Sequence, residues 1–144
     1  MKGRKPEAPN VVPLREGAAS APAPEPYDDM SVDAAATWRE LAPDLAMRGR
    51  LKPAYRPMFR VWCEAFSDVL KFTYDLHTMG DYFRTETRNG LQEKKRAAWG
   101  QRQDAIANMT RIGALFGLTP LDEARFGPDG QKDLLAMLKE TLDG

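Results

Sequence analysis

The side chains that could do chemistry are few, and most of them are basic. The chain has one histidine, His77, and one cysteine, Cys63, so it lacks the Cys/His cluster that a zinc site needs. It also lacks a Gly-x-x-x-x-Gly-Lys phosphate loop that would hold ATP. No sequence motif indicates a Ser-His-Asp catalytic triad. We therefore predict a protein that is not an enzyme and that uses neither a cofactor nor a metal.

A run of basic residues, which we call the basic corner (residues 48–60), contains five bases and no acid. The whole chain of 144 residues carries 21 basic and 21 acidic residues, so this run is a local feature of a neutral protein. Lysine and arginine side chains of this kind can contact the phosphates of DNA. The alternative is that the charges are simply solvated. The candidate DNA-binding residues are Arg48, Arg50, Lys52, Arg56 and Arg60, with Lys2, Arg4 and Lys5 as an auxiliary arm.

Two long helices would position the basic corner. Large apolar side chains from Phe59 to Phe83, with Thr73 and Gly80 filling two places, recur in alternating steps of three and four, which is typical of helices packed lengthwise. A weaker apolar stripe follows in residues 91–116. We predict an antiparallel helical hairpin, about 54–83 and 91–117, whose apolar side chains form a core or an interface between subunits. The residues predicted for this role are Phe59, Trp62, Phe66, Trp99 and Ile106.

Shorter elements surround this hairpin. Ser31 can cap a first helix, Pro43 should kink or split it, and Gly49 can end it. Residues 84–90 are predicted to form a loop or a single strand of marginal stability, and residues 93–96 to start the return helix. The predicted fold class is therefore all-α.

Composition divides the chain into three parts. Residues 1–28 are rich in proline and alanine and predict a flexible tail with a basic tip. Residues 29–120 are predicted to form the helical core, and residues 121–144 an acidic helical segment with a last helix at about 131–142. No apolar run approaches the roughly 18 residues of a membrane span. A single cysteine suits the reducing cytoplasm.

Several short motifs, in this order and spacing, resemble the terminase small subunit of tailed bacteriophages over roughly residues 1–126. The motifs are Gly3-Arg4-Lys5-Pro6 before the proline-rich tail, residues 38–45 (WRELAPDL) followed by Gly49-Arg50-Leu51, Asn89-Gly90, and Phe116-Gly117-Leu118-Thr119-Pro120. Two arginines often follow the last motif in that family. In this chain Glu123 takes the first of those places and Arg125 keeps the second.

The resemblance implies a role that composition does not reveal. Small terminase subunits bind viral DNA at or near the packaging start, assemble as rings, and recruit and regulate the large subunit, which holds the ATPase and nuclease. The implied partners are double-stranded viral DNA, the terminase large subunit and further copies of this chain, in the host cytoplasm. The alternatives are a dimeric helical transcription regulator that uses the same basic corner, and a helical scaffold that binds no DNA.

Overall fold

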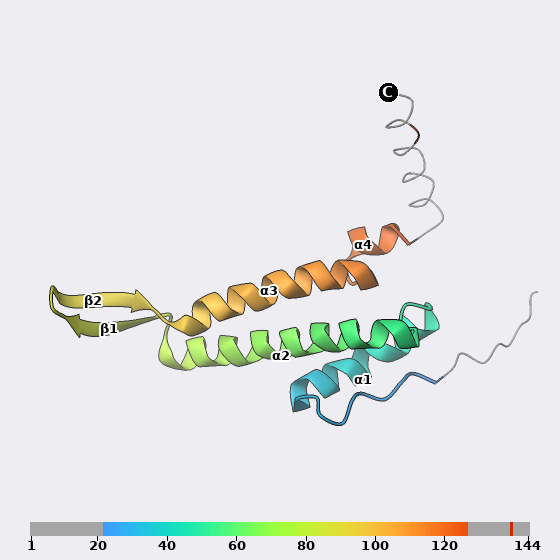
Figure 1. Cartoon of the computed structure of the whole chain (residues 1–144), viewed down its shortest axis with the longest axis horizontal. Helices are drawn as coiled ribbons and strands as arrows, with labels where there is room; N and C mark the ends of the chain where they lie inside the picture. The colour runs from blue at the N-terminus through green and yellow to red at the C-terminus, as the bar shows by residue number, and fades with distance from the viewer. Residues whose placement is uncertain (1–21, 127–138, 140–144) are drawn as a thin grey trace, which may run out of the picture.

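The computed structural model describes residues 22–126 and Lys139, which form an elongated helical body with a β-hairpin at one end (Figure 1). In chain order the elements are α1 (Val32–Met47), the 3-10 turn η1 (Pro53–Tyr55), α2 (Arg56–Met79), β1 (Tyr82–Thr87), β2 (Gly90–Lys95), α3 (Ala97–Phe116) and α4 (Pro120–Ala124). Helices α2 and α3 lie side by side and run in opposite directions, and α1 packs on the first half of α2 (Figure 1).

The all-α prediction is wrong, because β1 and β2 pair as an antiparallel hairpin between the two long helices. Helix α2 ends at Met79, so Phe83 lies in a strand and not in the helix. Residues 91–95, predicted as helix, belong to β2. Gly80, with φ of +79°, ends α2, and the Thr and aromatic residues that follow favour extended backbone. This strand preference overrides the apolar spacing that extended the helix in the sequence-based prediction.

The core lies where α1 crosses α2 and meets the end of α3. Trp38, Phe59 and Cys63 are the largest fully buried side chains. The Trp38 and Phe59 ring centroids are 4.8 Å apart, and the Phe59 and Phe116 centroids are 5.5 Å apart. The indole Nε1 of Trp38 donates a hydrogen bond of 2.7 Å to the carbonyl oxygen of Pro24. One aromatic cluster therefore joins three helices and the segment before α1.

Cys63 is buried in this core. Burial in apolar surroundings disfavours the thiolate and raises the pKa of the Cys63 thiol to about 12. The neighbouring Glu64 carboxylate raises the pKa further in the same direction. The thiol therefore stays protonated at neutral pH and acts as a small apolar side chain of the core.

Local sequence signals explain how the helices begin and end. The Ser31 hydroxyl accepts a hydrogen bond from the Ala34 amide, which confirms the predicted cap of α1. Gly49 has φ of +70°, and the amide of Arg50 returns to the carbonyl oxygen of Leu45 at 2.8 Å, which is the pattern of a glycine-terminated helix. Helix α1 continues through Pro43 and is not split there. Pro43 is exposed, so solvent can reach the backbone around it.

Arg96 fastens the base of the β-hairpin to the end of α2. Its guanidinium Nη2 donates to the carbonyl oxygen of Met79 and its Nε to that of Gly80, both at 2.9 Å. The Arg96 amide also donates to the carbonyl oxygen of Asp81 at 2.9 Å. A cation at carbonyl groups left unpaired at a helix C-terminus is favourable for charge as well as for hydrogen bonding. No helix within residues 22–126 combines the length and apolarity that a membrane crossing requires.

Candidate nucleic-acid interface

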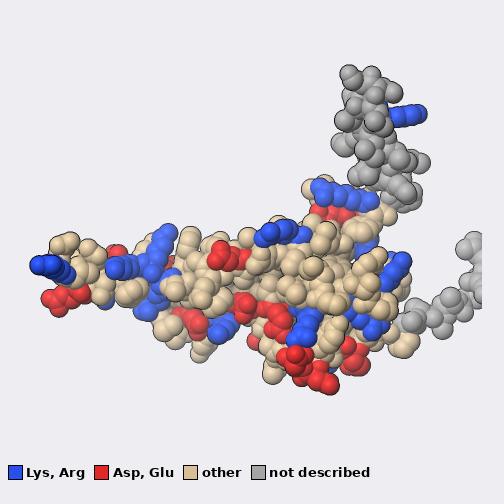
Figure 2. Space-filling view, in the orientation of Figure 1, with Lys and Arg blue, Asp and Glu red and all other residues tan. Residues whose placement is uncertain are grey.

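The basic corner lies at the end of the body opposite the β-hairpin (Figure 1). It contains the end of α1, the turn after it, η1 and the start of α2. The positive φ of Gly49 reverses the chain, and Pro53 begins η1. Pro57 lies in the first turn of α2, where its missing amide proton costs no hydrogen bond. Basic residues on both sides of this turn are thus brought to one end of the molecule (Figure 2).

Arg48 and Arg50 are held by the segment that follows α3. Arg48 forms an ion pair with Asp44 at 3.0 Å and a second one with Glu123 of α4. Arg50 lies 3.9 Å from the same Glu123 carboxylate, and its guanidinium stacks 4.4 Å from the centre of the Phe126 ring. With only 13% of its side chain exposed, Arg50 is an anchor for α4 as much as a surface charge.

Arg60 belongs to a different surface. Its Nη2 lies 2.8 Å from the Asp29 carboxylate, and its guanidinium lies 5.0 Å from the centre of the Tyr27 ring. The hydrogen bond from Arg60 lowers the pKa of Asp29, and the same hydrogen bond raises the pKa of Arg60. This pair holds the segment before α1 against α2. Arg48 and Arg50, in contrast, follow α1 and contact α4.

Within residues 22–126, Lys52 and Arg56 are the two bases of the corner that form no ion pair with an acid. Lys52 is exposed, and Arg56 is half-buried at the start of α2. The Nε of Arg56 is buried without a hydrogen-bond partner in this part of the chain. These two side chains are therefore the best placed of the five to meet an anion.

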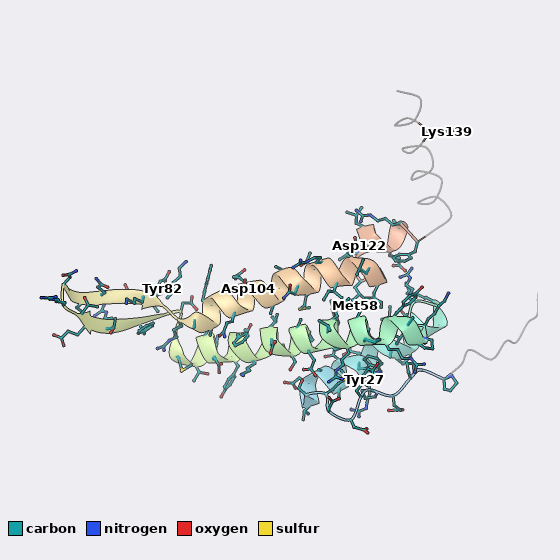
Figure 3. The ribbon with its side chains drawn as sticks, in the orientation of Figure 1. Tyr27, Met58, Tyr82, Asp104, Asp122 and Lys139 are labelled. Carbon is teal, nitrogen blue, oxygen red and sulfur yellow. The ribbon has the colours of Figure 1, made fainter. Side chains whose placement is uncertain are left out.

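A cavity of about 530 Å³ opens beside the basic corner, between the start of α2 and the ends of α3 and α4. Met58 and Asp122, labelled in Figure 3, mark its α2 side and the neighbouring α4. Its walls combine apolar side chains with the two arginines that contact Glu123. The lining residues include Arg48, Arg50, Tyr55, Met58, Leu115 and Phe126.

A second hollow, which we call the apolar groove, runs between α2 and α3 and has a volume of about 280 Å³. Trp62 forms its floor, and the indole Nε1 donates to the carbonyl oxygen of Met109 at 3.1 Å. Gly113 makes this approach possible, because a Cβ there would lie 3.2 Å from the indole nitrogen. The other side chains that line the groove include Phe66, Val69, Ile106, Thr110 and Leu118.

The family model described as "Phage terminase, small subunit" matches residues 34–133, which is more than half of the chain. The chain belongs to this family. The match spans α1, both long helices, the β-hairpin and α4. No curated protein and no solved structure gave a match. Membership among the small subunits agrees with the prediction that the chain is not itself an enzyme.

The residues predicted as core or interface divide into two groups in the terminase small subunit. Phe59 and Trp62 are buried, whereas Phe66 is half-buried and Ile106 is exposed at the rim of the apolar groove. Trp99 is half-buried at the base of the β-hairpin, with the Lys95 ammonium 4.0 Å from the centre of its ring. The first group stabilises the fold, and the second leaves apolar surface available for contact.

Sequence reasoning missed Glu123 as the residue that organises the basic corner of the terminase small subunit. A signal was present, because Glu123 stands where the family often has arginine. The bases Lys2, Arg4 and Lys5 lie outside the described residues, as does the helix predicted at 131–142 except for Lys139. His77 is exposed on α2. Within residues 22–126, no three His, Cys, Asp or Glu side chains are placed to hold a metal ion.

Proposed function

We propose that this terminase small subunit is a DNA-packaging adaptor of the host cytoplasm. It binds double-stranded viral DNA, assembles as a ring and recruits and regulates the large terminase subunit. The observation that supports DNA contact most directly is the unbalanced positive charge of Lys52 and Arg56, at the end of the body, in a member of this family.

DNA binding by the basic corner depends on phosphate contacts and not on reading of bases. Lys52 and Arg56 meet phosphates directly. Arg48 and Arg50 add to the contact when phosphate oxygens replace the Glu123 carboxylate beside them. Arg60 lies beside Asp29 and adds least. Contacts of this kind position a protein on the duplex and release counterions, so affinity falls as salt rises.

Reversing both free charges, as in Lys52→Glu/Arg56→Glu, should weaken binding to duplex DNA by at least about tenfold in moderate salt. The plot of log affinity against log salt should lose about 1.8 from its slope, because each lost phosphate contact removes about 0.9. Fluorescence anisotropy with a labelled duplex across a salt series measures both quantities.

The matched control for this pair is Arg39→Glu/Lys71→Glu, which changes net charge equally at two exposed sites outside the corner. It should keep most of the affinity and the slope. Equal losses in the two double variants would mean that net charge matters and the corner does not. An unchanged affinity in Lys52→Glu/Arg56→Glu would rule out the corner as the DNA site.

Ring assembly places the apolar groove of one copy against the opposite side of α2 in the next. Val61 is 50% exposed although it is apolar. Phe66 lies five positions further along α2, so the two side chains lie about 140° apart around the helix at ~100° per residue. Each copy thus has a groove on one side and an exposed apolar side chain on another, and head-to-tail contact between two such surfaces forms a ring when the rotation between copies closes.

Recruitment of the large subunit falls to the acidic C-terminal segment, residues 121–144, which has six acids and three bases. Of this segment the structure describes α4, Arg125 and Phe126 and, further on, Lys139. Asp122 and Glu123 lie within α4, and Glu123 is turned toward the basic corner. The remaining acids continue beyond this anchored end and form the proposed dock.

A further inference from the structure

The β-hairpin extends past the ends of α2 and α3 and contributes nothing to the core (Figure 1). Every residue of β1 and β2 is exposed except Thr85 and Thr87, which are half-buried. A two-stranded hairpin with no helix or third strand against it is at best marginally stable alone. Its residues are therefore explained better by contact with another molecule than by packing within this chain.

The register gives the hairpin two faces of different character. Directly opposite residues of an antiparallel pair project their side chains on the same side. One face, which we call the acid-free face, carries Phe83 opposite Lys94, Thr85 opposite Gln92, and Thr87 opposite Gly90. The other face carries Tyr82 opposite Lys95, Arg84 opposite Glu93, and Glu86 opposite Leu91. The two bases on that face, Arg84 and Lys95, are thus matched by two acids, Glu86 and Glu93. Only the acid-free face has an uncompensated charge.

The turn at the tip adds a second base. Arg88 and Asn89 connect the paired residues Thr87 and Gly90, and Gly90 takes φ of +100°. The Thr87 hydroxyl donates to the carbonyl oxygen of Gly90 at 2.9 Å and accepts from the Asn89 amide at 3.3 Å. These bonds fix the turn and present Arg88 at the far end of the molecule. Figure 2 shows lysine and arginine at this tip and again near the base of the hairpin.

Several contacts attach the base of the β-hairpin to the two long helices. Hydrogen bonds from Arg96 to the carbonyl oxygens of Met79, Gly80 and Asp81 tie its base to the end of α2. The Lys95 ammonium packs over Trp99 on the other side, where Tyr82 marks the start of β1 (Figure 3). These contacts hold the base of the hairpin, and with it the acid-free face, against the end of α2 and the start of α3.

We propose that the β-hairpin is a second DNA-contacting element, with its acid-free face laid into a groove of the duplex and Arg88 against the backbone. This inference rests on the proposed function. A major groove about 12 Å wide admits a two-stranded ribbon, whose strands lie about 4.8 Å apart. Lys94 supplies a phosphate contact, and Thr85 and Gln92 supply hydrogen-bonding groups. A protein partner would find one large apolar side chain here, Phe83, which is 37% exposed.

The length of α2 relates this element to the basic corner. Helix α2 has 24 residues and spans about 36 Å at 1.5 Å per residue. One turn of B-form DNA spans about 34–36 Å. The basic corner and the base of the β-hairpin are thus separated by about one turn of duplex, and Arg88 lies further out at the tip of the hairpin.

The test compares two double variants that remove equal charge. Arg88→Gln/Lys94→Gln alters the tip and the acid-free face, and Arg84→Gln/Lys71→Gln alters the opposite face and an exposed site on α2. Affinity for a duplex of three helical turns is measured by anisotropy across a salt series. The first variant should lose about 1.8 from the salt slope, for two phosphate contacts at about 0.9 each, and the second should lose less than half of that.

DNA binding by the wild-type protein distinguishes failure of the proposed function from failure of the hairpin inference. Failure of the wild type to bind any duplex overturns the proposed function and this inference together. Wild-type binding that depends on Lys52 and Arg56, with equal slopes in these two double variants, overturns this inference alone. A lower native mass of Arg88→Gln/Lys94→Gln with unchanged DNA affinity would assign the hairpin to contact between copies, which also overturns it.

Discussion

Trp38→Ala is expected to lower the free energy of unfolding by about 3–5 kcal/mol, the usual range for truncating a buried tryptophan. The Trp38 side chain has no exposed surface, and it packs between Phe59 of α2 and Tyr27 of the segment before α1. Its indole hydrogen bond to Pro24 is lost as well. Domains of this kind are stable by only about 5–15 kcal/mol, so the variant should be partly unfolded near physiological temperature.

Urea unfolding followed by far-ultraviolet circular dichroism measures this loss. Trp99→Ala is the matched control, because it removes the same side chain from a half-buried site at the base of the β-hairpin. Its loss should be less than half as large. Equal destabilisation by the two substitutions would contradict a core centred on the contact between α1 and α2.

Ile106→Glu should convert the assembled protein into single chains. Ile106 is 39% exposed at the rim of the apolar groove, so a carboxylate there remains hydrated in the isolated chain. In the proposed ring the same carboxylate is enclosed by apolar side chains of a neighbouring copy, and an unpaired buried charge costs several kcal/mol. The cost recurs at every interface. Native mass should therefore fall to the 16.1 kDa of one chain.

Val32→Glu is the control for this substitution, because it also replaces a β-branched aliphatic residue with an acid. Val32 is 85% exposed at the start of α1, and it does not line the groove. This variant should keep the native mass of the wild type. A variant Ile106→Glu that assembles normally would mean that the groove is not the interface between copies, whatever the oligomeric state.

The helices could be predicted from sequence because the signals that set them are local. The Ser31 cap, the left-handed glycines at 49 and 117, and the Thr119–Pro120 start of α4 all act within a few residues. The hairpin could not be placed in the same way. Gly80 and Phe83 happened to continue the apolar spacing of α2, and only the pairing of β1 with β2 shows that the spacing had ended.

The basic corner was visible in sequence, but the state of its charges was not. Arg60 pairs with Asp29, which is 31 residues away, and Arg48 pairs with Glu123, which is 75 residues away. Such partners are set by how α1 and α4 pack on the long helices. In the described part of the chain the five bases therefore differ: Arg48 and Arg50 contact Glu123 of α4, and Arg60 pairs with Asp29 on another surface. Lys52 and Arg56 form no ion pair there.

The central claim, a ring-forming adaptor for DNA packaging, is tested most directly by the native mass of the wild-type protein. Light scattering or native mass spectrometry at low and at moderate salt gives this quantity. We expect one high-order species whose mass is many times the 16.1 kDa of the chain and persists at moderate salt, because the proposed interface is apolar. A monomer or dimer at every concentration would contradict the ring. The apolar groove would then be only a gap in the packing between α2 and α3.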